Sequence, residues 1–420
     1  MKKEGKPVDT KFDKLHQALM EAKKASGTGG PDLDFSNTEN AFASKTDAEL
    51  KKAAWLFRLM NKPWLVSVGS KLGLAAIQLR LPFVDKVVKS TIFEQFCGGT
   101  TLLESVPTIE KLAAQNTFTA LEYGAEAKES EEDFNKTMKE TIRSIEFAAI
   151  NESVPVVSSK ITGMARFGLL QMIQEDKPHT DKTRAEYKIV LKRIDAVCHV
   201  ARQKGVAIFF DAEESWIQDT IDHLVKVMMR RYNREKVVVY NTFQMYRSDR
   251  LKYLMTSFDE AQLGGYFLGA KLVRGAYMDK ERERAERLGY PSPIHPNKRA
   301  TDESYNMGVR FCVDNYEKIA LCNATHNAES CLLMAQMIHE RKLPKDHAHL
   351  NFCQLLGMSD HLTFNLAFAG FNVAKYVVFG AVKEVLPYLI RRAQENTSVA
   401  GDMSRELQLI SEELKRRKLD

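Results

Sequence analysis

Short apolar runs recur along this chain, and charged or polar residues close most of them. These closing residues are Lys160, Asp211, Ala212, Gln244, Lys271, Arg274, Thr325, His326, Asn327 and Gln354. Tyr376 sits at the start of the last run. The set combines cations, a carboxylate, amides and a phenol, which are groups that bind an anionic substrate and hold it in a reactive orientation. We therefore expect the run ends to converge on one site.

The segment YLIRRAQEN carries a second set of chemically useful residues. Their spacings of three, one and three residues place them on one helical stripe about 100° wide. They are Tyr388, Arg391, Arg392 and Glu395. Two adjacent guanidinium groups form a fork that suits a carboxylate or a phosphate. A solvated helix face shows the same pattern, but the position directly after the last apolar run favours a binding role.

Other kinds of function are compatible with parts of this pattern. A Schiff-base aldolase would use a lysine at a strand end, either Lys160 or Lys271, with the two arginines holding a phosphate. A binding or scaffold protein without catalysis is a further alternative. The spacing of the histidines does not indicate a metal site, because no second pair of an acid and a histidine accompanies His347 and His349.

The apolar runs themselves predict the elements that position these groups. Eight runs rich in Val, Ile and Phe begin near residues 117, 154, 206, 237, 266, 319, 349 and 375, with charged helical stretches between them. Continuous apolar runs predict strands covered on both faces, and hence a parallel sheet. Eight such units over about 285 residues predict an α/β (β/α)8 TIM-type barrel, whose active site lies at the carboxyl ends of the strands. An open doubly wound sheet is the alternative, although no GxGxxG follows any run.

The chain divides into three parts on this reading. Residues 1–114 are expected to form a helical N-terminal region, with a linker-like stretch rich in Gly and Ser at 25–40. The barrel is predicted over 115–400, followed by a helical tail over 401–420. The apolar and basic stretch Trp55–Phe96 suits either core helices or a patch that contacts a membrane surface.

Composition excludes several classes of protein. Of the 420 residues, 44% are apolar, which is enough to bury a core without disulfides or a metal. The net charge of +6 is too small and too widely spread to indicate nucleic-acid binding. The longest charge-free apolar-rich run, His361–Ala374, has fourteen residues, whereas a membrane-spanning helix needs about 20. The six cysteines form no CxxC pair, so we expect buried, reduced thiols.

Several motifs tie the chain to a known family. KLVRGAYMDKERERAERLGYPSP, ATHN, FCQLLGM and YLIRRAQEN resemble the proline dehydrogenase (proline oxidase) family, in order, over roughly 115–400. FSNTENAF and TIFEQFCGG resemble the N-terminal part of that family, and VVSSKITGMARFGLL is similar to its compact, eukaryote-like branch. The resemblance implies a distorted barrel that holds FAD. It also implies oxidation of L-proline to Δ1-pyrroline-5-carboxylate, the first step of proline catabolism, with electrons passed to a membrane quinone.

The resemblance also implies roles for individual residues. The residues that match catalytic positions are Asp211, Lys271 and Tyr277. Those that match substrate-binding positions are Lys160, Tyr376, Tyr388, Arg391, Arg392 and Glu395. Those that match FAD contacts are Ala212, Gln244, Lys271, Val273, Arg274, Gly275, Ala276, Thr301, Thr325 and His326. Lys271 departs from many bacterial members, which have Arg there, and a lysine is a point charge rather than a bidentate donor.

Hydroxyproline dehydrogenase, from the same family, remains an alternative activity. Tyr376 favours proline, because a phenol at the family's ring-contacting position would crowd a 4-hydroxyl group. The resemblance further implies a peripheral membrane contact and an oligomer. It places a bacterial protein in the cytoplasm or on the inner face of the membrane, and a eukaryotic one in the mitochondrial matrix or at the inner membrane.

Overall fold

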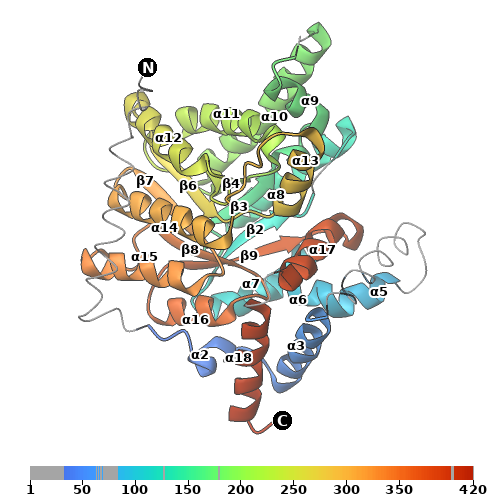
Figure 1. The fold of residues 1–420 in the computed structure, drawn as a ribbon, viewed down its shortest axis with the longest axis vertical. Coiled ribbons are helices and arrows are strands. Elements are labelled where there is room, and N and C mark those ends of the chain that lie inside the picture. The colour runs from blue at the N-terminus through green and yellow to red at the C-terminus, as the bar shows by residue number, and fades with distance from the viewer. Residues whose placement is uncertain are drawn as a thin grey trace, which may run out of the picture.

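Eight parallel strands close into a barrel surrounded by helices in the computed structural model (Figure 1), which describes residues 33–62, 64, 66, 69, 84–125, 128–177, 180–398 and 402–419. The strands are β2 (Phe118–Tyr123), β3 (Val156–Lys160), β4 (Ala207–Asp211), β5 (Val239–Gln244), β6 (Leu268–Val273), β7 (Ile319–Ala324), β8 (Leu350–Leu355) and β9 (Val373–Phe379). They pair in chain order, and β9 pairs with both β8 and β2, which closes the sheet. The predicted (β/α)8 barrel is therefore confirmed, and each predicted apolar run coincides with one of its strands, although β9 begins two residues before the last run.

Helices connect the strands and cover the outside of the barrel (Figure 1). They are α8 (Glu131–Ala148), α9 (Phe167–Gln174), α10 (Asp181–Lys204), α11 (Ser215–Tyr232), α12 (Arg250–Gly264), α13 (Met278–Leu288), α14 (Lys298–Asp314), α15 (Ala328–Glu340), α16 (Asp360–Phe368) and α17 (Val382–Ser398). The last of them, α17, follows β9 and contributes side chains to the cavity described below.

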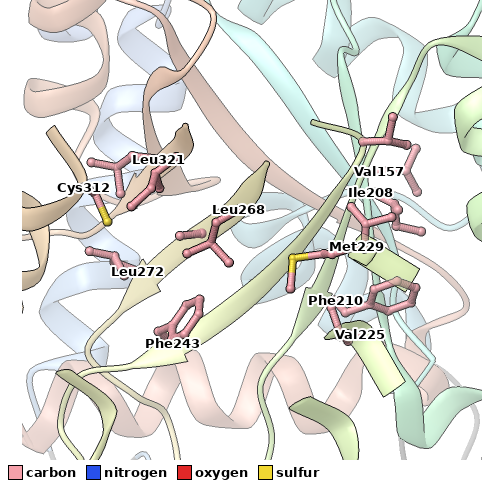
Figure 2. Close-up of a cluster of buried hydrophobic side chains, with 14 of the residues drawn as sticks. Val157, Ile208, Phe210, Val225, Met229, Phe243, Leu268, Leu272, Cys312 and Leu321 are labelled. Atoms are coloured by element: carbon pink, nitrogen blue, oxygen red, sulfur yellow. The ribbon is translucent and has the colours of Figure 1, made fainter. Parts of the chain in front are cut away.

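Side chains along each strand point alternately toward the helices, where they form the core, and into the barrel, where they form the site. In β4, Ile208 and Phe210 face the helices, where they join the same buried cluster as Val225 of α11 (Figure 2). Phe209 and Asp211 alternate with them and point into the barrel, where Asp211 lines a cavity. The apolar run thus supplies the outer core with every second residue and the site with the others.

A group of helices lies beside the barrel, formed by both ends of the described chain (Figure 1). They are α2 (Thr38–Phe42), α3 (Asp47–Met60), α5 (Val84–Val88), a π-helical segment (Lys89–Phe93), α6 (Glu94–Phe96), α7 (Val106–Ala113) and the C-terminal α18 (Asp402–Arg416). Arg417 ties the end of α18 to this group, donating to the carbonyl of Phe42 at 2.8 Å and to Asp47 Oδ1 at 3.0 Å. Of the predicted helical region 1–114, residues 1–32 and most of residues 63–83 lie outside the described residues.

Two predictions for the N-terminal region are wrong in part. Helix α2 begins at Thr38, inside the stretch 25–40 predicted to be linker-like, because the side chain of Asn37 caps it by accepting from Asn40 N at 3.0 Å. The region 1–114, predicted to be helical, contains the strand β1 (Cys97–Gly99), which pairs with the end of β9. The two strands can lie this close only because residue 98 is glycine: a Cβ on Gly98 would lie 2.5 Å from Val377 Cγ1.

The start of the last strand also differs from the prediction. β9 begins at Val373, so Tyr376 lies in the middle of the strand and not at its start. The stagger of the barrel explains why Tyr376 still reaches the site, because its register partner is Leu355, the last residue of β8. All six cysteines are buried free thiols, as predicted. Within the described residues, no helix is long and apolar enough to cross a membrane.

Candidate active site

One cavity of about 310 Å³ opens at the carboxyl ends of the barrel strands and beneath α17. Most of the predicted site residues line it, although the chain separates them by up to 232 positions. They are Lys160, Asp211, Ala212, Gln244, Lys271, Val273, Arg274, Gly275, Ala276, Tyr277, Thr325, His326, Tyr376, Tyr388, Arg391 and Arg392. The predicted convergence of the run ends on one site is therefore what the structure shows.

Two predicted site residues are not part of this lining. Thr301 lies in the first turn of α14, where its hydroxyl donates to the carbonyl of Asn297 at 3.4 Å. The residue that reaches the site from this turn is its neighbour, Asp302, whose Oδ1 accepts from Arg274 Nε at 2.8 Å. Glu395 belongs to α17, but its side chain lies outside the described part of the chain.

Asp211 is the centre of a buried charged cluster at the floor of the cavity. Its Oδ1 accepts from Lys271 Nζ at 2.6 Å and from Ser158 Oγ at 3.0 Å, and its Oδ2 accepts from Tyr376 Oη at 2.7 Å. Lys160 Nζ lies 3.8 Å from the same Oδ2. The cluster draws on β3, β4, β6 and β9, whose side chains meet only because the sheet closes.

The electrostatics of this cluster keep its carboxylate and its ammonium charged. Burial alone would raise the pKa of Asp211, but the positive charges of Lys271 and Lys160 outweigh it and lower the pKa to about 2. Burial would likewise lower the pKa of Lys271, and the attraction of Asp211 raises it instead. The Lys271 ammonium also lies 4.7 Å from the centre of the Tyr376 ring, a cation–π distance.

Glu122 completes the charge balance and was not predicted from the sequence. It is 2% exposed, and its Oε1 accepts from Lys160 Nζ at 3.2 Å. Two carboxylates, Glu122 and Asp211, therefore face two lysines, Lys160 and Lys271. The signal in the sequence is a single acid inside the apolar run TFTALEYG, which a strand buries only when a cation faces it.

Arg274 is held in a fixed orientation at the edge of the cavity. Its guanidinium donates to Asp302 Oδ1, to Thr325 Oγ1 at 2.6 Å and to Ser330 Oγ at 3.0 Å. It also stacks over the ring of Tyr305 at 4.4 Å from the ring centre. Asp302 and Ser330 were not predicted from the sequence. They orient the guanidinium of Arg274, which was predicted to be a site residue.

The arginine pair enters the cavity from α17. Arg391 lies 5.9 Å from the ring centre of Tyr277, and Arg392 lies 5.1 Å from that of Tyr388. Leu389 of the same helix packs into the core and is 1% exposed. Three residues of the predicted helical stripe, Tyr388, Arg391 and Arg392, therefore line the cavity.

The first turn of α17 is anchored to β2, the strand that pairs with β9, and to the helix after it. Glu384 accepts from Tyr123 Oη at 2.8 Å and from Lys136 Nζ at 3.0 Å. Because Tyr123 ends β2 and Lys136 belongs to α8, this anchor fixes the helix that carries the arginines.

The remaining lining combines apolar residues, among them Ala212, Val273 and Ala276, with hydrogen-bonding groups. Gln244 Nε2 donates to the carbonyl of Glu213 at 2.6 Å, which leaves the amide oxygen available to a ligand. His326 Nδ1 bonds to Ser359 Oγ at 2.9 Å, and burial together with nearby cations lowers its pKa to about 3, so its ring is neutral. Gly275 has φ +139°, and a Cβ there would lie 2.5 Å from the Tyr246 ring, so the loop after β6 closes on the barrel only with glycine.

This donor set fits a flavin. Val273, Ala212 and Ala276 offer an apolar surface to a planar ring, and Arg274 offers a cation to an anionic group. The amide oxygen of Gln244 suits a ring N–H group. Within the described residues, no group of His, Cys, Asp and Glu could hold a metal ion.

A closed parallel barrel with a charged cavity at the strand ends has the architecture of a (β/α)8-barrel enzyme. The comparison with protein families narrows this class. The proline dehydrogenase family model matches residues 105–405, and the chain therefore belongs to the proline dehydrogenase family, a family of oxidoreductases that act on proline. The predicted family is confirmed.

Individual relatives agree with this assignment. The chain is 32% identical over 437 residues to proline dehydrogenase 1, mitochondrial, of Dictyostelium discoideum, which covers 92% of this chain and 75% of that protein. It is 28% identical over 421 residues to hydroxyproline dehydrogenase of Xenopus laevis, covering 92% and 90% of the two chains. Among solved structures, proline utilization A from Bdellovibrio bacteriovorus has the same fold, with a TM-score of 0.67 and 19% identity. The match covers 94% of this chain but only 42% of that one.

Proposed function

We propose that this protein is an FAD-dependent L-proline dehydrogenase. It oxidises L-proline to Δ1-pyrroline-5-carboxylate and passes the electrons to a membrane quinone. The observation that carries the proposal is the cavity itself, which combines a guanidinium pair from α17 with apolar lining residues and a buried charged cluster around Asp211. The unit that performs the reaction is the barrel, over residues 115–400.

The guanidinium groups of Arg391 and Arg392 bind the carboxylate of proline in this proposal. Both line the cavity, and Arg392 is only 6% exposed, so a bound anion is shielded from water. Lys160 already faces Glu122 and Asp211, and it adds positive potential from below the carboxylate site. Holding the carboxylate at two points orients the ring without any covalent bond to the protein.

Tyr376 and Tyr388 hold the ring of the substrate. The hydroxyl of Tyr376 is fixed by Asp211 and Ser158, which restricts the phenol to one rotamer facing the cavity. A rigid phenol packs against the methylenes of proline and crowds a hydroxyl group on the same ring. This is why we assign proline, and not hydroxyproline, as the preferred substrate.

FAD would be held by Arg274, Gln244, Thr325 and His326 and by the loop Val273–Tyr277. When bound, it would supply a two-electron acceptor for the oxidation of proline. The protein orients the ring carbon beside the proline nitrogen and excludes water. Asp211 is not the base that deprotonates the amine, because a carboxylate with a pKa of about 2 is a weak proton acceptor. In this proposal the amine enters in its neutral form, and Asp211 fixes Lys271 and Tyr376.

The ion pairs of the two candidate lysines argue against the alternative function of a Schiff-base aldolase. A lysine nucleophile must be uncharged, and both candidate lysines are ion-paired: Lys160 with Glu122, and Lys271 with Asp211. The pKa of Lys271 is raised, which is the wrong direction for a nucleophilic amine. These lysines stabilise negative charge in the cavity.

The location of the protein follows from its electron acceptor in this proposal. A quinone dissolved in a bilayer requires a peripheral contact with that membrane, and we place the contact on α3 and its neighbours. Trp55 and Trp64 are 50% and 64% exposed there, beside the exposed Lys51 and Lys62. Relatives from eukaryotes are named mitochondrial, which supports a mitochondrial location if the source is eukaryotic and a site on the inner face of the membrane if it is bacterial.

A steady-state assay tests the proposal. The purified protein, with FAD added, is mixed with L-proline and a water-soluble quinone, and quinone reduction is followed by absorbance. We expect turnover with L-proline, slower turnover with trans-4-hydroxy-L-proline, and none with D-proline. Turnover of hydroxyproline at a higher kcat/KM than proline would assign the protein to the alternative activity, and no quinone reduction with either substrate would contradict the proposal.

A further inference from the structure

The C-terminal helix α18 reaches the cavity through a chain of hydrogen bonds. We infer that Glu406 is a positioning residue: it fixes the loop after β8 and, through Ser359, the imidazole of His326. This inference rests on the proposed function in one respect, because His326 is there assigned to the FAD site. It adds a residue from outside the barrel to that site.

The contacts that carry the inference are short and consecutive. Glu406 Oε1 accepts from the backbone N–H of Ser359 at 2.7 Å. The hydroxyl of Ser359 bonds to His326 Nδ1 at 2.9 Å, and His326 lines the cavity. If the serine donates this bond, the proton of the neutral ring resides on Nε2, which can then donate to a ligand.

The backbone of Ser359 explains why this loop needs support. Its φ is +52°, the left-handed region, which a residue other than glycine rarely adopts. Ser359 is also the N-cap residue of α16, and its side chain makes no capping bond to that helix but contacts His326. A strained residue persists only where its surroundings hold it. The carbonyl of Ser359 accepts from Leu362 and Thr363 of α16. The carboxylate of Glu406 accepts from the N–H group of Ser359.

The surroundings of Glu406 disfavour the charged form of its carboxylate. Glu406 is 5% exposed, and burial together with the nearby carboxylate of Asp360 raises its pKa to about 7. Asp360 pairs with Lys375 at 2.8 Å and with Lys45 at 3.3 Å. The ring of His361 lies 3.5 Å from Glu406 Oε1 and is neutral, because burial lowers its pKa to about 3. Among the described residues, the hydrogen-bond partner of the Glu406 carboxylate is therefore Ser359.

Helix α18 offers a matched control for this residue. Glu413, two turns further along, is fully buried and accepts from Arg416 and Arg417. It anchors the same helix to the same N-terminal helices, but it makes no contact with the loop after β8. A variant at Glu413 therefore tests the docking of α18 without touching the path to His326.

The experiment compares Glu406→Ala, Glu406→Gln, Ser359→Ala and Glu413→Ala with the wild type. Two properties are measured: the Kd for FAD, by quenching of flavin fluorescence, and the His326 signal in NMR spectra of flavin-free protein labelled at histidine. The His326 signal is assigned with His326→Gln. We expect Glu406→Ala and Ser359→Ala each to raise the Kd about tenfold, the value of one hydrogen bond of roughly average strength, and to shift the His326 signal in the same way.

The other two variants define the outcome. Glu406→Gln retains an oxygen that can accept from Ser359, so its Kd and His326 signal should stay near those of the wild type. Glu413→Ala should lower the thermal midpoint and leave the His326 signal in place. Equal effects of Glu413→Ala and Glu406→Ala would overturn the inference, since helix docking alone would then explain both.

An unchanged His326 signal in Glu406→Ala would also overturn it. If Glu406→Ala does not fold, Ser359→Ala decides the point, because it leaves α18 untouched. A wild-type protein that binds no FAD would sink the proposed function, and the His326 signal in the flavin-free protein would then decide the inference alone.

Discussion

Replacing Asp211 with Asn should destabilise the protein through the lysine left behind. Asn keeps the size of the side chain but removes the charge that accepts from Lys271 at 2.6 Å. Lys271 is 5% exposed, so its ammonium would stay buried without a partner of opposite charge. Breaking a buried ion pair on one side costs about 3–5 kcal/mol.

The opposite change should cost less. In Lys271→Met, the carboxylate of Asp211 keeps its bonds from Tyr376 and Ser158 and keeps Lys160 at 3.8 Å. We expect a smaller cost, about 2 kcal/mol, because the carboxylate that remains keeps its other hydrogen bonds. In the double variant neither charge remains, so its cost should fall below the sum of the two by about 2–3 kcal/mol.

Thermal unfolding of the flavin-free proteins at pH 7 measures these differences. An unfolding entropy of about 2.1 cal/mol/K per residue over 420 residues converts about 1 kcal/mol into about 1 °C. Asp211→Asn should therefore lower the midpoint by about 3–5 °C, and the double variant should lower it by less than Asp211→Asn does. Midpoint shifts that add to within about 1 °C in the double variant would refute the buried pair.

The ion pair of Asp211 and Lys271 also predicts that the stability of the protein depends on pH. The pKa of Asp211 is lower in the folded protein than its ordinary value of 3.8, so its stabilising effect is complete above about pH 4 and is lost as the pH falls towards 2. The difference in midpoint between wild type and Asp211→Asn should shrink over that range. A difference that stays constant down to the acid limit of folding would contradict the assignment.

Three further predictions concern the substrate and the membrane. Arg392→Met should raise the KM for L-proline at least tenfold and leave the flavin bound, because a desolvated carboxylate loses a partner worth about 2–5 kcal/mol; an unchanged KM in steady-state kinetics would remove Arg392 from the substrate site. Tyr376→Ser should narrow the preference for proline over trans-4-hydroxy-L-proline, which we expect to be roughly 10–200-fold in kcat/KM for the wild type, and equal turnover of both substrates by the wild type would show that Tyr376 does not contact the ring. Reversing the charge of Lys51 and Lys62 should weaken sedimentation with anionic liposomes while reduction of a soluble acceptor stays the same, and equal sedimentation of variant and wild type would favour a purely structural role for α3.

The strands could be predicted from the sequence because they are buried on both faces. A run such as VAIFFDAE has no helical periodicity, and its polar end marks the edge of the sheet. The same argument placed Asp211 and Lys271 at one rim. It could not show that they touch, because they are 60 residues apart and their contact depends on the closure of the sheet.

The parts that the sequence did not reveal depend on tertiary partners. Asp302 stands next to Thr301, and only the direction of the first turn of α14 decides which of the two reaches Arg274. Glu406 lies in a polar amphipathic helix whose sequence suggests a solvated tail, yet it is buried against the loop after β8. Residues of this kind act through a neighbour, so their own type and spacing carry no signal.

The central claim is that the cavity binds a flavin and delivers the electrons of L-proline to it. A visible absorption spectrum of the purified protein, recorded without oxygen before and after addition of L-proline, tests it most directly. We predict the absorption bands of an oxidised flavin, bleached by L-proline and left unchanged by D-proline. A protein that retains no flavin after FAD is added and the unbound excess is removed, or a bound flavin whose spectrum L-proline does not change, would contradict the account.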